Sequence, residues 1–170
     1  MNSAEAKSIA NMLIQGLERE YETTRKVVAA IPENQLDFKL GEKGRTTREL
    51  AWHLIASEAW FADGVAKGDF SQPEVEMPAN ATVADMVAFY EKELPAKTGK
   101  VKALSGDDLA KEVAFFGMMN LPNVLYLGFW NSHSIHHRGQ LSTYLRAMNA
   151  HVPSIYGGSA DEPFVMPAGA

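Results

Sequence analysis

The chain has 170 residues, of which 46% are hydrophobic and 22% charged, and this is the composition of a folded globular protein. It contains no cysteine, which excludes disulfides, thiolate metal sites and a cysteine nucleophile. With 16 basic and 21 acidic residues its formal net charge is -5, so nucleic acid is not an expected partner.

The sequence also gives no sign of a membrane segment. Residues 1–20 carry acidic side chains and lack a basic stretch followed by an apolar run, so we expect no secretory signal. The longest uncharged stretch, 113–137, contains asparagines, a proline and histidines, which are costly in lipid. We therefore expect a cytoplasmic protein with a single domain, 1–170, whose tail is irregular from about residue 151.

Helical periodicity dominates the first half of the chain. Apolar residues recur at helical spacing over about 4–30, and Pro32 then predicts a stop. A second helix is predicted to begin after Thr46, because Thr46 and Glu49 have the spacing of a capping box. This helix should end near Gly68, since glycine is the usual residue just beyond a helix end.

The middle of the chain combines a third helix with a less regular segment. The third helix should begin at Thr82 and reach about Leu104, with Pro95 inside it predicting a kink or a break. Ser105 is expected to cap one or two further helical turns. The next residues, 114–117, are apolar, and we expect them to be irregular.

The last long periodic segment runs from about Pro122 to Asn149, with apolar residues and two histidines at every third or fourth position. Four long amphipathic helices and no convincing strand predict an all-α fold, an antiparallel-type four-helix bundle. The long connections leave the order of the helices open.

Three histidines are the candidate metal ligands. His133 and His137 are four residues apart on one helix, so both imidazoles can reach one cation. His53 lies on the inward stripe of the second helix and is the natural third ligand. Such a trio suits zinc, nickel, iron or copper and leaves a coordination position open. Each histidine alone could be a hydrogen-bonded core residue, but one shared cation would satisfy all three.

Several neighbouring residues receive structural interpretations. His136 lies about 100° around the helix from His137, so we expect it to contact other groups. Arg138 should pair with an acid on a neighbouring helix, Gln140 should contact a ligand histidine or lie at the core edge, and Glu58 is expected at the surface. Six aromatic residues could line a pocket, but we expect them to belong to the core: Trp52, Trp60, Phe115, Phe116, Tyr126 and Trp130.

Four segments carry a resemblance to a known family. They are RTTRELAWHL at 45–54, HSIHHRGQL at 133–141, YLR at 144–146 and VPSIYG at 152–157. In order and spacing, over nearly the whole chain, they resemble the DinB/YfiT-like family of metal-dependent enzymes.

The resemblance implies a bundle with up-down-down-up topology, a homodimer, and zinc, nickel or another divalent ion held by His53, His133 and His137. It also implies a transferase that uses a low-molecular-weight thiol on a small electrophile. Two alternatives stay open, namely a metal-dependent hydrolase that activates water, and a non-catalytic dimeric module that binds a metal or ligand. No general acid or base can be named from the sequence.

Overall fold

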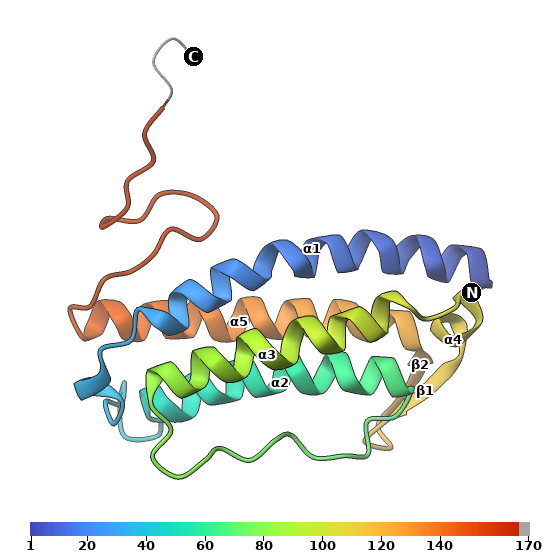
Figure 1. Cartoon of the computed structure of the whole chain (residues 1–170), viewed down its shortest axis with the longest axis horizontal. Coiled ribbons are helices and arrows are strands. Elements are labelled where there is room, and N and C mark those ends of the chain that lie inside the picture. The colour runs from blue at the N-terminus through green and yellow to red at the C-terminus, as the bar shows by residue number, and fades with distance from the viewer. Residues whose placement is uncertain (167–170) are drawn as a thin grey trace.

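The computed structural model describes residues 1–166, in which four long helices form a bundle (Figure 1). These helices are α1 (Ser3–Ala29), α2 (Thr47–Lys67), α3 (Val83–Lys102) and α5 (Tyr126–Ala147). In Figure 1, α1 and α5 run in one direction and α2 and α3 in the other, so the expected up-down-down-up bundle is confirmed. Residues 167–170, the end of the predicted irregular tail, lie outside the described residues.

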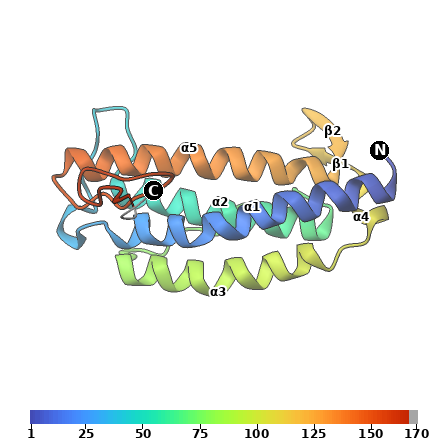
Figure 2. The same ribbon diagram turned by 90° about the horizontal axis from the view of Figure 1, so that it is seen from above.

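Helices α1 and α2 each pack between α3 and α5. Helices α1 and α2 both contact α3 and α5, and Figure 2 shows α3 and α5 on opposite sides of the α1 and α2 pair. Because α2 and α3 are parallel, the connection 69–82 must return along the length of the bundle (Figure 1). The buried apolar side chains form one continuous core.

Shorter elements lie at the two ends of the bundle. The 3-10 helix η1 (Glu33–Gln35) belongs to the connection between α1 and α2. At the opposite end, α4 (Gly106–Ala110) precedes an antiparallel pair, β1 (Glu112–Phe115) and β2 (Met119–Pro122). A second 3-10 helix, η2 (Asn123–Leu125), leads into α5.

Local capping explains where the helices begin. At each of four helix starts, the side chain of the N-cap residue accepts a hydrogen bond from the backbone amide three residues later. The acidic side chain of that later residue accepts one from the backbone amide of the N-cap residue. The four pairs are Asn2 with Glu5, Thr46 with Glu49, Thr82 with Asp85, and Ser105 with Asp108. Helix α2 ends at Gly68, which has the left-handed φ of 64° that glycine adopts without strain. The predicted limits of α2 are therefore confirmed.

The hairpin corrects the expectation of an irregular stretch at 114–117. Phe116 and Gly117 form its turn with φ values of 52° and 68°. Phe-Gly lacks the Asn-Gly or Asp-Gly pattern that marks such turns, so the hairpin could not be predicted from the turn residues. Helix α5 begins at Tyr126 and not at Pro122, because Pro122 is the last residue of β2.

Pro95, where a kink or a break was predicted, does not break helix α3. Helix α3 continues from Val83 to Lys102 with Pro95 inside it. Pro95 is exposed, so water can satisfy the Glu91 carbonyl that loses its usual amide partner.

A buried polar network joins the four long helices and corrects the surface prediction for Glu58. Glu58 of α2 is 3% exposed and accepts from Tyr90 Oη of α3 at 2.7 Å and from Thr24 Oγ1 of α1 at 3.3 Å. Burial raises the pKa of this carboxyl. Arg138 of α5 is 1% exposed, donates to Thr24 Oγ1 at 3.0 Å and pairs with Glu20 of α1, as predicted.

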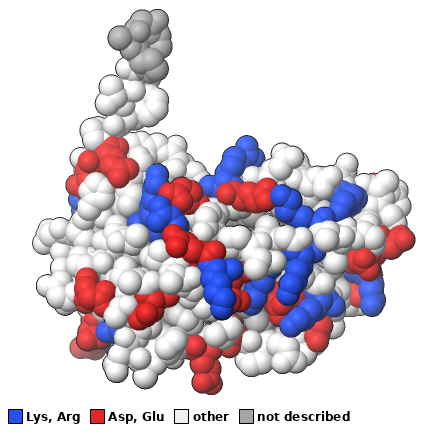
Figure 3. Space-filling model, in the orientation of Figure 1, with Lys and Arg blue, Asp and Glu red and all other residues white. Residues whose placement is uncertain are grey.

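Surface charge is mixed over the face that Figure 3 shows, where basic and acidic side chains are interspersed along α1 and α3. Within residues 1–166, no helix has the combination of length and apolar character that crossing a bilayer requires.

Candidate metal centre

The structure brings together the three histidines that the spacing selected. His53 comes from α2, and His133 and His137 come from successive turns of α5. Their ring centroids lie 5.0 Å apart for His53 and His133, 4.6 Å for His53 and His137, and 4.3 Å for His133 and His137. One ligand nitrogen from each ring lies within 4.8 Å of the others.

This geometry fits a divalent cation. Zinc binds imidazole nitrogen at about 2.0 to 2.1 Å, so two nitrogens on one ion lie at most about 4.2 Å apart. The present separations, up to 4.8 Å, are therefore close to those of ligands on a shared ion. Three imidazoles are a donor set for zinc or nickel and leave a position for a further ligand.

The contact of His133 with Ser57 indicates which ring nitrogen of His133 can bind a cation. Ser57 Oγ lies 2.5 Å from the His53 carbonyl oxygen and 3.2 Å from His133 Nδ1. The hydroxyl has one hydrogen, which it donates to the carbonyl, so its oxygen accepts from the Nδ1–H of His133. The lone pair of His133 is then on Nε2.

The other two histidines also have an oxygen near Nδ1. Gln140 Oε1 lies 2.7 Å from His137 Nδ1, and Glu74 Oε2 lies 3.4 Å from His53 Nδ1. The Gln140 oxygen accepts from the Nδ1–H of His137, whereas Glu74 lies beside His53 at ion-pair distance; both oxygens favour a proton on Nδ1 and a lone pair on Nε2. An oxygen on the second nitrogen is the usual environment of a histidine that binds a metal.

His133 and His137 are neutral at pH 7. The pKa of His133 falls to about 4, chiefly because the ring is buried and also because of charge repulsion from His137 and His53. Burial is also the main reason that the pKa of His137 falls to about 4. Neutral imidazoles offer lone pairs to a cation, whereas imidazolium ions do not.

Glu74 is the residue of this site that sequence reasoning missed. It lies in the 69–82 connection, which has no periodicity that would have placed it near His53. The connection is held on α2 by two indoles, because Trp52 Nε1 donates to the Val75 carbonyl at 3.0 Å and Trp60 Nε1 donates to the Gln72 carbonyl at 2.5 Å. These bonds flank Glu74 on both sides and hold it beside His53.

A cavity of about 400 Å³ adjoins the histidines, and we call it the aromatic cavity. Its lining includes Trp60, Phe61, Glu74, Phe115, Phe116 and His133. Trp60 and Phe116 stack with their planes 9° apart and their centroids 5.6 Å apart. Trp60, Phe115 and Phe116 thus line a pocket, which corrects their assignment to the core. Three other aromatic residues are buried as predicted: Trp52, Tyr126 and Trp130.

The remaining histidines lie outside this group of three. His136 is exposed, in agreement with its position around the helix, although its ring is 4.8 Å from that of His137. His151 is exposed in the tail, and its Nε2 lies 2.8 Å from Glu162 Oε1.

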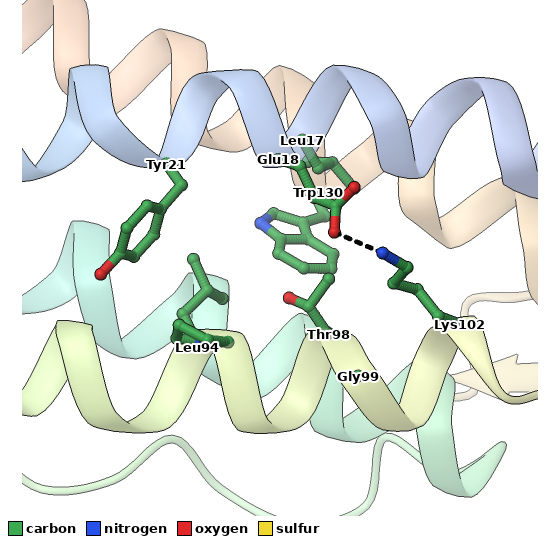
Figure 4. A pocket seen from close by; sticks show the side chains of 9 residues that line it. Leu17, Glu18, Tyr21, Leu94, Thr98, Gly99, Lys102 and Trp130 are labelled. Atoms are coloured by element: carbon green, nitrogen blue, oxygen red, sulfur yellow. Dashed lines mark hydrogen bonds and ion pairs between the residues drawn. The ribbon is translucent and has the colours of Figure 1, made fainter.

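A separate hollow of about 420 Å³ opens between α1 and α3 (Figure 4). Leu17 and Tyr21 line it from α1 and Leu94 from α3, and a 2.7 Å ion pair joins Glu18 to Lys102 at its side. The histidines come from α2 and α5, so this hollow is not part of the candidate metal centre.

Comparisons with known proteins agree with the fold. The uncharacterized protein YrdA of Bacillus subtilis (strain 168) is 25% identical over 149 residues, which cover 88% of this chain and 89% of that protein. A DinB-like protein from Bacillus cereus ATCC 10987 superposes with a TM-score of 0.73 at 23% identity, over 85% of this chain and 95% of the other. The DinB-like protein YjoA of Bacillus subtilis gives 0.69 at 19% identity, over 85% and 97%. The model of the DinB family matches residues 3–163, and the chain therefore belongs to this family.

Proposed function

We propose that the protein is a metal-dependent transferase that joins a low-molecular-weight thiol to a small electrophile. In this proposal His53, His133 and His137 hold a divalent ion, with zinc and nickel as the first candidates. The observation that carries it is the oxygen partner on Nδ1 of every one of these rings, because this arrangement leaves three imidazole lone pairs for a shared cation.

The ion would act as a Lewis acid that lowers the pKa of a thiol into the neutral range. In the transfer, the thiol sulfur forms a bond to an electrophilic carbon, and the leaving group departs with its electron pair. Glu74 is the carboxylate that lines the aromatic cavity, so it is our candidate for the base that accepts the thiol proton.

The aromatic cavity is our proposed site for the electrophile. Its walls include the stacked Trp60 and Phe116 and the edge-on contact of Phe115 with Phe116 at 4.7 Å. Such walls favour a small apolar molecule, because binding it removes apolar surface from water. His133 lies at the same cavity and connects it to the histidine cluster.

A hydrolase is the second candidate, and Glu74 is the observation that favours it. A carboxylate beside the cluster can accept a proton from water as well as from a thiol. Ser57 is no nucleophile for either reaction, because its side chain is fully buried and its hydroxyl donates to the backbone of His53.

Thiol consumption with 1-chloro-2,4-dinitrobenzene, measured with and without a chelator, tests the proposal. We expect consumption that needs the metal and that falls about 100-fold in Glu74→Gln, since a positioned base contributes roughly that factor. Glu76→Gln, two residues away and exposed, is the matched control and should keep its rate. Chelator-sensitive ester hydrolysis without thiol consumption would favour the hydrolase, and metal binding without any turnover would favour a binding module.

A further inference from the structure

A second cavity, of about 630 Å³, lies on the other side of the histidine cluster. It is lined by the 40–45 loop on one side and by Gln140 and Tyr144 of α5 on the other. Along α5, His133 lines the aromatic cavity, His137 follows one turn later, and Gln140 and Tyr144 come next. At 1.5 Å per residue, the eleven steps from His133 to Tyr144 cover about 16 Å. The two cavities therefore lie on opposite sides of the cluster along this helix.

Helix α2 gives the same order independently. Leu50 lines the second cavity, His53 belongs to the cluster, and Trp60 lines the aromatic cavity. The histidines thus lie between two cavities that differ in their walls.

The second cavity is cationic. Lys43 and Arg45 line it, and none of its lining residues is acidic. Within residues 1–166, neither Lys43 nor Arg45 forms an ion pair with a carboxylate. The nearby Glu49 has its carboxylate engaged by the Thr46 amide at 2.6 Å. We call this the basic cavity.

The loop that carries these cations is held in position. Tyr144 Oη donates to the Arg45 carbonyl at 3.0 Å, and the Gly44 amide donates to the Gly41 carbonyl at 3.3 Å. Gly44 lies so close to the Tyr144 hydroxyl that an added Cβ would be 2.8 Å from it. A pre-positioned backbone reduces the entropy cost of binding a ligand between Lys43 and Arg45.

The basic cavity is also connected to the cluster by a hydrogen bond. Gln140, which bonds to His137, is itself part of the cavity lining. A ligand in the cavity therefore lies within reach of the candidate metal centre.

We propose that the basic cavity binds the carboxylate end of an anionic low-molecular-weight thiol, with the sulfur directed to the histidine cluster. This inference rests on the proposed transferase function and names the class of its cosubstrate. The seven residues from His137 to Tyr144 cover about 10 Å, so the carboxylate and the sulfur must be several bonds apart. The uncharged electrophile then occupies the aromatic cavity on the opposite side.

The test compares glutathione with its diethyl ester, which keeps the size and the thiol but lacks both carboxylate charges. Calorimetric titration of the zinc-loaded protein should show about tenfold weaker binding of the ester. Lys43→Gln with Arg45→Gln should weaken glutathione binding about tenfold and leave ester binding unchanged. The control, Lys26→Gln with Lys100→Gln, removes the same charge from outside the cavity and should bind both as the wild type does.

Glutarate, a dicarboxylate without sulfur, is titrated into the metal-free protein to separate this inference from the proposed function. Glutarate binding that is lost in the Lys43 and Arg45 variant supports the cavity even if the protein holds no metal and turns over no thiol. Three results would each overturn the inference. The variant could bind glutathione as tightly as the wild type does, the wild type could bind the diethyl ester as tightly as glutathione, or the wild type could bind neither glutathione nor glutarate. Metal-dependent thiol turnover alongside those results would leave the transferase function standing.

Discussion

Gln140 shows how a single residue can decide the properties of the site. Its side-chain oxygen is 2.7 Å from His137 Nδ1 and fixes the imidazole tautomer. Gln140→Leu keeps a side chain of similar size but removes this acceptor. We expect metal affinity to fall about 10- to 100-fold, the usual effect of losing such a partner.

Competition with a chelator of known zinc affinity measures this change. Gln15→Leu, an exposed position on α1, is the control and should bind metal as the wild type does. Unchanged affinity in Gln140→Leu would show that this hydrogen bond does not prepare His137 for a metal.

The low pKa values of His133 and His137 predict how the metal-free protein responds to acid. Their folded pKa is about 4, whereas the ordinary value is 6.5, so the unfolded chain takes up protons first as the pH falls. The free energy of unfolding that these groups contribute is therefore complete above pH 6.5 and is lost as the pH falls towards 4. After allowance for solvent screening of the partly exposed rings, we expect a loss of about 2 kcal/mol in total.

Urea unfolding of chelator-treated protein at neutral pH and at about pH 4.5 measures this loss. His133→Gln with His137→Gln serves as the control, because glutamine does not titrate, and it should lose about 2 kcal/mol less. An equal loss in the two proteins would contradict the prediction.

At the residue scale, the sequence predicted the side chains whose positions follow from helix geometry. His133 and His137 share a face because they are four residues apart, and His53 points inward because it lies on an apolar stripe. The positions of Glu74 and Glu58 could not be predicted in this way. The position of Glu74 depends on the path of a loop, and the burial of Glu58 depends on contacts from two other helices. Spacing along one helix carries no information about either.

At the element scale, helices were predictable where side-chain capping marks their first turn. The starts of α2, α3 and α4 follow directly from Thr46, Thr82 and Ser105. The start of α5 has no side-chain cap, and its predicted beginning at Pro122 was wrong. The hairpin was missed because its turn residues, Phe116 and Gly117, lack the usual polar turn signal.

The buried network between helices predicts unequal roles for two arginines of α5. Arg138 is buried and paired with Glu20, whereas Arg146 is half exposed and pairs with Asp161 at 2.8 Å. Arg138→Ala removes the cation that pairs with Glu20 and the donor to Thr24 in a buried network, and it should cost about 3 to 5 kcal/mol. Arg146→Ala should cost less than about 1 kcal/mol, the usual value for an exposed pair.

Urea unfolding of the two variants under the same conditions gives both free energies. Equal and small losses would show that the network contributes little to holding the helices together.

At the scale of the whole molecule, the topology explains how the candidate site is assembled. Because α2 and α3 are parallel, the 69–82 connection passes along the bundle and brings Glu74 to the histidines (Figure 1). The connection between α1 and α2 brings Lys43 and Arg45 to the same part of α5. Periodicity predicted four helices, but their order came only from the family resemblance, since long connections permit several arrangements.

Elemental analysis of the purified protein tests the central claim most directly, because both proposals about function depend on a metal shared by α2 and α5. We predict about one zinc or nickel ion per wild-type chain and almost none in His53→Ala or His137→Ala. His151→Ala, which changes an exposed tail histidine, should retain the full amount. A folded His53→Ala variant with as much metal as the wild type would contradict the account, because the ion would then not be shared between the two helices.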